Sequence, residues 1–312
     1  NVVASQIALH RRFGGVVPEI ASRQHVLALP TVTAAALREA AMGWREIEGI
    51  AVTYGPGLAG PLLVGINFAM GLSLARRIPL FAVNHVEAHV LSVWLETPEP
   101  PRLPMVSLVV SGGHTELILV EGVGRYRVLG ATVDDAAGEA FDKVGRLLGL
   151  PYPGGPSVEK AAGKANGTVT ELPRAWLPGT YDFSFSGLKT AVLRLVQTQG
   201  KVASPEGAER LSLAEEDVAS IAAGFQESVA DVLTAKLARA VEDQGAGSAA
   251  IVGGVANNKC LLNVARSRLD VELRWPAPGL STDNAAMIAG AALLNPRPAD
   301  YDLDAVPSLS LS

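Results

Sequence analysis

Short apolar segments that end in glycine-rich turns recur along the chain, and helical segments follow several of them. In the first, a strand is expected over residues 50–53, a turn over Gly55–Gly60 and an apolar helix over about 62–76. Comparable strands are expected at residues 80–83, 105–110, 115–120 and 249–252, with a helix over about 259–268 after the last. Buried strands that alternate with helices predict an α/β fold.

Other segments have the period of helices. These helices are expected over about 136–148, from a capping box at Ser212 and Glu215 to about 241, and from about 281 to 296. In the first of them, Glu139 with Lys143 and Asp142 with Arg146 form two i, i+4 pairs that would be solvated ion pairs. Residues 161–199 lack clear periodicity and are interpreted as an insertion folded onto a second lobe.

Size and charge narrow the function classes. The chain has 312 residues, 48% of them hydrophobic, so it exceeds the size at which a single core usually divides, and two lobes are expected. The apolar stretch over residues 62–75 is interrupted and shorter than the ~20 residues that cross a bilayer, so we expect a buried helix and no membrane partner.

One cysteine, Cys260, and no secretory leader indicate the cytoplasm. Because the net charge is −5, nucleic acid would have to meet a local patch such as His10–Arg12, or another subunit.

Two histidines four positions apart, His85 and His89, are the most specific chemical feature. A helix turns ~100° per residue, which places both imidazoles on one face and Glu87 on the opposite side. Histidines so spaced can share a metal ion. A zinc protease needs a glutamate directly after the first histidine, so the position of Glu87 argues against that class. The alternative is one buried core histidine and one incidental histidine.

A metal held by this pair needs a further donor from a distant part of the chain, with positions left open for substrate. Asp283 is the best candidate, because its carboxylate would point from the N-terminus of the helix over about 281–296. A capping role, which stabilises a helix by ~1 kcal/mol, explains an aspartate there equally well.

The glycine turns Ser111–Gly113 and Gly253–Asn258 are candidate phosphate-binding loops, because backbone N–H groups can approach an anion there. Each turn taken singly is explained equally well as a plain tight turn. His114 is a candidate general base, although a histidine after a glycine turn is more often structural. Cys260 is interpreted as a packing residue. No catalytic residue is therefore assigned beyond the metal site.

Six sequence strings together resemble the TsaD family, the bacterial tRNA N6-adenosine threonylcarbamoyltransferases. In chain order the strings are NHVEAH, LVVSGGHTEL, DDAAGEAFDKVGRLLGLPYPGGP, FSFSGLKT, GGVANNK and STDNAAM. They are preceded by GGVVPEIASRQH and YGPGLAGPLLVG. The resemblance runs from Ser5 to Asn295, and several strings are long and unusual, so it is specific.

The resemblance implies a two-lobed actin-like, sugar-kinase-like (ASKHA) fold, with a cleft between the lobes that holds a nucleotide and a metal ion. The first lobe is expected to comprise residues 1–104, with 284–312 returning to it. The second is expected to comprise residues 105–283, including the insertion at about 161–199. The family opens with a strand and loop of the type GIETSCDET. Residue 1 falls about where that hairpin ends, so the first lobe is expected without it.

The resemblance also implies site residues. The metal ligands fall on His85, His89 and Asp283, which spacing also suggests. The substrate-binding positions fall on Val109, Val110, Ser111, Gly112, Gly113, Asp142, Gly155 and Asn258. Asp142 is then expected to bind hydroxyls or the amino acid portion of the substrate, and Asn258 to lie at the adenosine end.

For this family, the expected reaction transfers a threonylcarbamoyl group from threonylcarbamoyl-AMP to N6 of adenosine 37 in tRNAs that read codons beginning with A. The expected cofactor is one divalent metal ion per subunit, Fe²⁺ or Zn²⁺, and an adenine nucleotide is part of the substrate. The implied partners are tRNA, a TsaB-like subunit that pairs with the first lobe, and a TsaE-like ATPase.

Other functions remain open. A nucleotide-driven ATPase or phosphotransferase of the same fold would use the same glycine turns and would release phosphate without tRNA. A non-catalytic subunit of the modification complex would be inert and still bind its partners. A metalloprotease is the least favoured. Two departures from the family pattern, Pro61 in place of a serine and Asn257 in place of a small residue, lie near the expected ligand.

Overall fold

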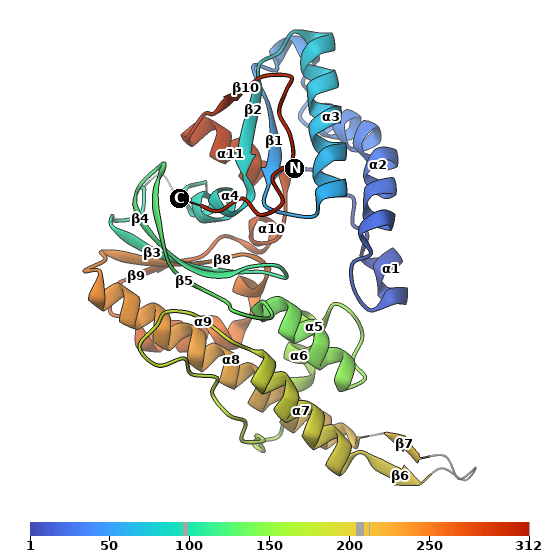
Figure 1. The fold of residues 1–312 in the computed structure, drawn as a ribbon, viewed down its shortest axis with the longest axis vertical. Coiled ribbons are helices and arrows are strands. Elements are labelled where there is room, and N and C mark those ends of the chain that lie inside the picture. The colour runs from blue at the N-terminus through green and yellow to red at the C-terminus, as the bar shows by residue number, and fades with distance from the viewer. Residues whose placement is uncertain (96–98, 204–208, 212, 312) are drawn as a thin grey trace. The chain divides into compact units, whose positions relative to one another are not determined.

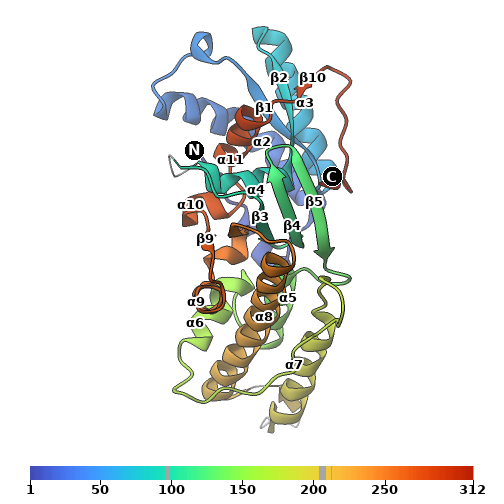
Figure 2. The same ribbon diagram turned by 90° about the vertical axis from the view of Figure 1, so that its left-hand side faces the viewer.

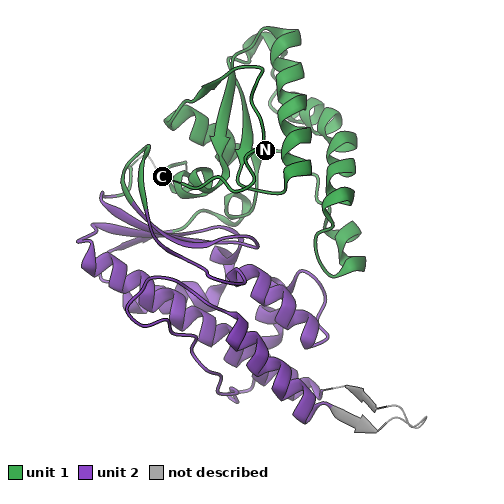
Figure 3. Cartoon of the chain, in the orientation of Figure 1, with its two compact units in different colours: residues 1–101, 120–127, 275–312 green, residues 102–119, 128–274 purple. Residues whose placement is uncertain are grey.

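The structure, a computed structural model of this chain, describes residues 1–95, 99–203, 209–211 and 213–311. The chain forms two units, shown in different colours in Figure 3. Unit 1 comprises residues 1–101, 120–127 and 275–312, and unit 2 comprises residues 102–119 and 128–274. Two segments for which the sequence suggested the second lobe, residues 120–127 and 275–283, belong to unit 1.

The centre of unit 1 is a parallel pair of strands, β1 (Ile50–Gly55) and β2 (Leu80–Asn84). A short strand, β10 (Pro298–Ala299), pairs antiparallel with the other edge of β2. The connection from β1 to β2 is α3 (Ala59–Arg76), in the place where the glycine turn and the apolar run predicted a helix. A second long helix, α2 (Pro18–Glu39), packs against α3 (Figure 1).

Only part of α3 is buried. Leu62, Ile66, Ala69 and Ser73 form its covered face, whereas Leu63 and Leu74 are exposed. The expectation of a buried helix is therefore wrong for most of its length. Within the part of the chain that the structure describes, α3 alone passes a length-and-composition test for a membrane span, with 22% of the tested stretch buried; helices of many non-membrane proteins pass it too.

Two helices that are far apart in the sequence pack together in unit 1. α4 (His85–Leu91) begins immediately after β2, and α11 (Ala285–Leu294) lies against it. Their shared apolar core consists of Val83, Ala88, Leu91, Met287 and Ala291, all buried. This packing brings the loop before α11 to the start of α4.

A five-stranded sheet with the order β5-β4-β3-β8-β9 belongs to unit 2, except for the end of β4 and the start of β5, which lie in the segment 120–127 of unit 1. Its strands are β3 (Met105–Val110), β4 (Thr115–Gly122), β5 (Arg125–Ala131), β8 (Ser248–Val252) and β9 (Glu272–Arg274). β3 runs parallel to β8, with Val109 opposite Val252. Every residue of β3 and β8 is buried, which explains why both strands are apolar in the sequence except for Ser107 and Ser248.

Five helices accompany this sheet. They are α5 (Ala137–Leu147), α6 (Gly154–Ala162), α7 (Ser186–Gln199), α8 (Glu215–Asp243) and α9 (Lys259–Arg268). The long helix α8 packs on β3 and against α6 and α9 (Figures 1 and 2). Ser212, expected in a capping box at the start of this helix, lies outside the residues that the structure describes. The segment interpreted as an aperiodic insertion contains α7, in which Leu188, Val192 and Val196 form a buried i, i+4, i+8 stripe.

Short elements complete the description. The α-helical turns are α1 (Ile7–His10) and α10 (Pro278–Ser281), and the 3₁₀ turns are Arg11–Phe13, Trp44–Glu46, Ser92–Trp94 and Gly254–Asn257. β6 (Lys201–Ala203) and β7 (Glu209–Leu211) pair antiparallel as a two-stranded ribbon.

Candidate metal centre and substrate loops

His85 and His89 lie together on one side of α4. Asn84, the last residue of β2, caps the helix by accepting hydrogen bonds from the N–H groups of Val86 at 2.9 Å and Glu87 at 3.2 Å, so the helix begins at His85. The two imidazole centroids are 4.7 Å apart in an edge-to-face arrangement. The i, i+4 spacing therefore brings the rings together as helical geometry predicts.

Asp283 reaches both imidazoles from the loop before α11. Its Oδ1 atom lies 3.4 Å from Nε2 of His85 and 3.2 Å from Nε2 of His89. Capping of α11 falls to the neighbouring residue, since Oδ1 of Asn284 accepts a hydrogen bond from the N–H of Met287 at 2.9 Å. A capping role therefore does not account for Asp283.

The distances between these three donors suit a metal ion. One ligand atom from each of His85, His89 and Asp283 lies within 4.8 Å of the other two. Metal–ligand bonds of about 2.0–2.1 Å in a tetrahedral arrangement separate the ligand atoms by roughly 3.3 Å. The 3.4 and 3.2 Å separations from Asp283 match that value. Two imidazoles and one carboxylate also leave coordination positions free for substrate.

The protonation states are those of metal ligands. Desolvation lowers the pKa of His89 below the ordinary value of 6.5, and the hydrogen bond with Asp283 only partly opposes this, so the imidazole is neutral at pH 7. Desolvation acts to raise the pKa of Asp283, but the hydrogen bonds with His85 and His89 outweigh it and hold that pKa well below its usual range. The Asp283 side chain is 76% exposed, so these hydrogen bonds rather than burial decide its charge.

Glu87 takes no part in the cluster, as predicted from its angular position on α4. Its side chain is buried, accepts a hydrogen bond from Nδ2 of Asn295 at 2.7 Å, and forms an ion pair with Nη2 of Arg297 at 3.0 Å. Neither partner was predicted from the sequence.

In unit 2, the loops that follow β3 and β8 are neighbours, because parallel strands end at the same edge of a sheet. Val109 and Val110, at the end of β3, are fully buried, so only their backbone is available to a ligand. Gly253, directly after β8, has φ +95°, and a Cβ atom there would collide with the carbonyl of Val110. A glycine is therefore required for the close approach of the two loops.

Ser111 organises the loop after β3. Its Oγ accepts hydrogen bonds from the N–H groups of Gly113 at 3.3 Å and His114 at 3.1 Å, and its own N–H donates to the carbonyl of His114 at 2.9 Å. The N–H of Gly138, at the start of α5, donates to the Ser111 carbonyl at 3.0 Å. The N–H of Gly112 has no partner among the residues described, so it is the amide this loop can offer to an anion.

Asp142 joins α5 to α6. Its Oδ1 accepts a hydrogen bond from the N–H of Gly154 at 2.6 Å instead of pairing with Arg146, so the expected Asp142–Arg146 pair is wrong. The other expected pair, Lys143 with Glu139, is formed at 2.9 Å. Desolvation raises the pKa of Asp142, which marks its carboxyl group as half-buried rather than solvated.

The remaining candidate residues lie at helix starts. Gly155, in the first turn of α6, has open space where a Cβ atom would be. Asn258 caps α9 through its Oδ1, and its Nδ2 donates to Oε1 of Gln226 at 3.4 Å. Glu159, on α6, accepts a hydrogen bond from the N–H of Lys259 at 2.8 Å. Gln226 and Glu159 carry no sequence signal for this site, because they come to this loop through the packing of α6 and α8.

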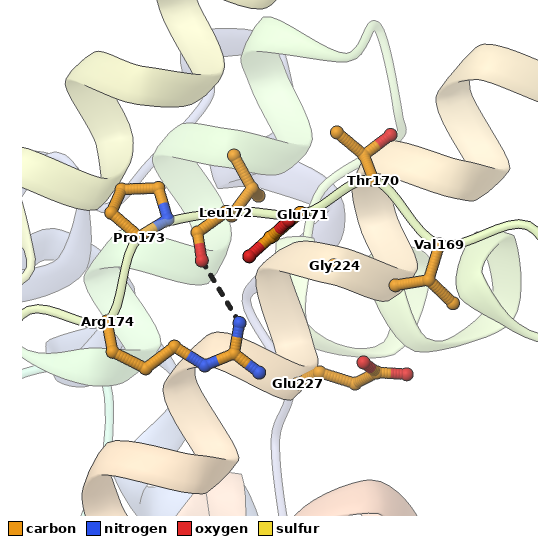
Figure 4. A pocket seen from close by; sticks show the side chains of 8 residues that line it. All are labelled: Val169, Thr170, Glu171, Leu172, Pro173, Arg174, Gly224 and Glu227. Carbon is orange, nitrogen blue, oxygen red and sulfur yellow. Dashed lines mark hydrogen bonds between the residues drawn. The ribbon is translucent and has the colours of Figure 1, made fainter.

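A separate pocket of about 450 Å³ lies in unit 2 (Figure 4). It is lined by Val169–Arg174 together with Gly224 and Glu227 of α8. Arg174 is held there by the Leu172 carbonyl at 3.0 Å and by Asp231 at 3.1 Å. The lining includes none of the candidate substrate residues, so the pocket is not assigned to the site.

Comparisons with known proteins identify relatives over the full chain. Residues 1–290 match the family model described as "TsaD: tRNA N6-adenosine threonylcarbamoyltransferase". A protein of that name from Thermomicrobium roseum is 48% identical over 329 residues, covering 100% of this chain and 90% of the relative. Another from Bacillus licheniformis is 48% identical over 320 residues, with the same coverage of 100% and 90%.

Solved structures support the fold class alone. HypF from T. kodakarensis superposes with a TM-score of 0.58 at 13% identity, covering 87% of this chain and 42% of that protein, so this chain spans less than half of it. Component A of (R)-2-hydroxyglutaryl-CoA dehydratase from Acidaminococcus fermentans superposes with a TM-score of 0.50 at 15% identity. The match covers 85% of this chain and 82% of that protein. The predicted α/β fold of the actin-like, sugar-kinase-like (ASKHA) class is confirmed. Given the match over residues 1–290 and full-length relatives at 48% identity, the chain belongs to the TsaD family of tRNA N6-adenosine threonylcarbamoyltransferases.

Proposed function

We propose that this protein transfers the threonylcarbamoyl group of threonylcarbamoyl-AMP to N6 of adenosine 37, next to the anticodon, in tRNAs that read codons beginning with A. The N6 nitrogen bonds to the carbamoyl carbon and gives up one proton, while the bond from that carbon to the phosphate oxygen breaks and AMP leaves. The observation that carries the proposal is the family match over residues 1–290.

His85, His89 and Asp283 would hold one divalent ion, Fe²⁺ or Zn²⁺. When bound, such an ion supplies Lewis-acid polarisation of the carbamoyl oxygen, an effect worth several kcal/mol of charge stabilisation. The 3.4 and 3.2 Å spacings and the protonation states of the donors support this assignment. Both metals accept two imidazoles and a carboxylate, so the donor set leaves the choice between them open.

The other site residues of the chain would bind and orient the donor substrate. An exocyclic adenine amine is a weak nucleophile, so holding the reacting atoms close contributes much of the rate. We assign the adenine nucleotide part of the donor to Val109, Val110, Ser111, Gly112, Gly113, Asp142, Gly155 and Asn258. In this assignment the free N–H of Gly112 donates to the phosphate, and the carboxylate of Asp142 accepts from hydroxyl groups.

We further propose a TsaB-like subunit as the partner of an apolar groove on unit 1. The groove, of about 320 Å³, is lined by Val26, Leu29, Leu63, Val64, Asn67 and Phe68 of α2 and α3. Val26 and Leu63 are exposed there, and contiguous exposed apolar side chains mark protein interfaces. A TsaE-like ATPase would complete the assembly. Because its substrate is tRNA, we propose that the protein acts in the cytoplasm.

The test is a reconstituted reaction. Wild type and His85→Ala are each mixed with the TsaB-like and TsaE-like partners, unmodified tRNA, threonylcarbamoyl-AMP and either metal, and the modified nucleoside is measured by mass spectrometry. We expect turnover by the wild type and loss of it in the variant. Unchanged turnover in His85→Ala would remove the metal from the mechanism. Phosphate release without tRNA would favour an ATPase, and inert wild type that still binds its partners would indicate a non-catalytic subunit.

A further inference from the structure

Glu87 is a buried carboxylate that the proposed reaction does not use. It lies on α4 between the two histidines in sequence, with 2% of the residue exposed. Both of its carboxylate oxygens are engaged: Oε1 accepts a hydrogen bond from Asn295 at 2.7 Å, and Oε2 forms an ion pair with Arg297 at 3.0 Å. Burying a charge is costly unless it is paired and hydrogen-bonded, and a well-packed apolar pair of similar size is often no less stabilising. Stability alone is therefore a weak explanation for this pair.

The partners of Glu87 connect α4 to the far end of α11. Asp283 precedes α11 and contacts the imidazoles of α4, whereas Asn295 and Arg297 follow α11 and contact Glu87. The two helices are thus joined by polar contacts at both ends of α11. Between these contacts lies only the apolar core that they share.

The shared apolar core by itself sets the rotation of the seven-residue helix α4 less sharply than a directional contact does, because apolar contact is non-directional. The hydrogen bond from Asn295 and the ion pair with Arg297 are directional. Because each residue of a helix is ~100° from the next, a rotation that releases Glu87 on one side also turns His85 and His89 on the other.

Arg297 is itself held in place by the backbone. Its carbonyl accepts a hydrogen bond from the N–H of Ala82 at 3.0 Å, within β2, the strand that leads directly into α4. The adjacent strand β10 pairs with β2, Pro298 opposite Phe81. The backbone of Arg297 is therefore fixed relative to β2 and to the first residue of α4. A side chain that positions α4 needs such a fixed attachment.

We infer that Glu87 and Arg297 form a positioning pair, which sets the rotation of α4 so that both imidazoles face Asp283. The inference rests on the metal centre of the proposed function. Neither Glu87 nor Arg297 touches the metal or the substrate; both act through the histidines. Removing the pair should weaken metal binding by about tenfold, at the lower end of what outer-shell changes cost a metal site.

The experiment measures Zn²⁺ dissociation constants by competition with a chromophoric chelator, on wild type and on Glu87→Gln and Arg297→Lys. Arg297→Lys retains the positive charge, so its Zn²⁺ affinity should fall less than that of Glu87→Gln. If Glu87→Gln does not fold, Arg297→Lys still tests the inference. The matched control is Asp231→Asn in unit 2, which removes the anion from ion pairs with Arg174 at 3.1 Å and Arg268 at 2.6 Å. Visible spectra with Co²⁺ report the ligand geometry in each protein.

We expect weaker Zn²⁺ binding and an altered Co²⁺ spectrum for the two pair variants, with wild-type values for Asp231→Asn even though its melting temperature falls. Wild-type affinity and spectrum in a folded Glu87→Gln would overturn the positioning role and leave the metal centre intact. Equally weakened Zn²⁺ binding in Asp231→Asn would also overturn the positioning role, because the loss of affinity would then follow from lower global stability. Wild type that binds neither ion would remove the metal centre and this inference together.

Discussion

Nε2 of His89 lies 3.2 Å from Oδ1 of Asp283, although 194 positions separate the two residues in the chain. The contact depends on the packing of α4 against α11, two helices of unit 1 that come from distant segments of the chain. Substitutions in that packing should therefore affect the metal centre as directly as substitutions of its donors.

Asp283→Asn tests the carboxylate donor. The change keeps the size of the side chain and removes its charge, so Zn²⁺ affinity should fall by more than the roughly 10–100-fold that loss of an outer-shell partner costs. Competition with a chromophoric chelator measures it. Asp302→Asn, at an exposed position of the same unit, is the control and should bind Zn²⁺ like wild type. Equal affinity in both variants would exclude Asp283 as a ligand.

Acid should destabilise the metal-free protein. Burial lowers the pKa of His89 in the folded state, so as the pH falls below 6.5 the unfolded chain takes up a proton before the folded one does. The free energy of unfolding therefore decreases with falling pH in that range. Thermal unfolding between pH 7.5 and 5 should show a shallower slope for His89→Asn than for wild type. Parallel slopes would contradict a lowered pKa at this histidine.

Gly253→Ala should disrupt the loops at the end of β3 and β8. A Cβ atom would meet the Val110 carbonyl, and the φ of +95° is unfavourable for alanine, so the free energy of unfolding should fall by about 1–3 kcal/mol or more. Urea unfolding measures the change. Gly187→Ala, in the first turn of α7 with open space around it, is the matched control and should be neutral. Similar losses in both variants would contradict the steric account.

Leu63→Asp tests the apolar groove of α2 and α3. A charge in the groove should weaken binding of the TsaB-like partner by at least about tenfold, because the carboxylate must be desolvated in the interface. Isothermal titration calorimetry with the purified partner measures this, and Zn²⁺ affinity should stay unchanged. Leu293→Asp, at an exposed position outside the groove, should bind the partner normally. If Leu63→Asp binds as tightly as wild type, the partner uses another face.

Cys260→Ala should leave turnover unchanged. Burial raises the pKa of the Cys260 thiol to about 11, and the charges of Glu227 and Glu159 add to the rise, so the group is a thiol and not a nucleophilic thiolate at pH 7. Alkylation by iodoacetamide at pH 7.5 should accordingly be slow in the folded protein. Rapid alkylation, or loss of turnover in the variant, would contradict the packing role.

The sequence predicted those elements whose faces are strongly apolar. The runs at β2, β3 and β8 predict strands because these strands are almost entirely buried, and the run at β1 does so although most of that strand is half-buried. α9 was expected at its observed limits, Lys259–Arg268. In contrast α2 was not predicted: it contains Pro30, and Ala21 is its one buried residue, so it carries little of the pattern that marks a helix.

In the candidate site, too, contacts within one helix could be predicted from the sequence, whereas contacts between distant segments could not. The i, i+4 spacing was enough to predict that His85 and His89 share a face, because helical geometry is local. Spacing left Asp283 undecided between ligand and cap, since only tertiary packing separates it from Asn284. The partners of Glu87 could not be predicted at all, because Asn295 and Arg297 reach it through the return of α11 to β2.

The donor set of the metal centre has one further consequence. An imidazole binds a metal in its neutral form, so two imidazoles and a single carboxylate would leave one unit of positive charge uncompensated on a dication. A centre with a net positive charge attracts an anionic acyl phosphate from solution and favours the added negative charge on its acyl oxygen. A second carboxylate in place of either histidine would cancel that excess, and with it much of the attraction.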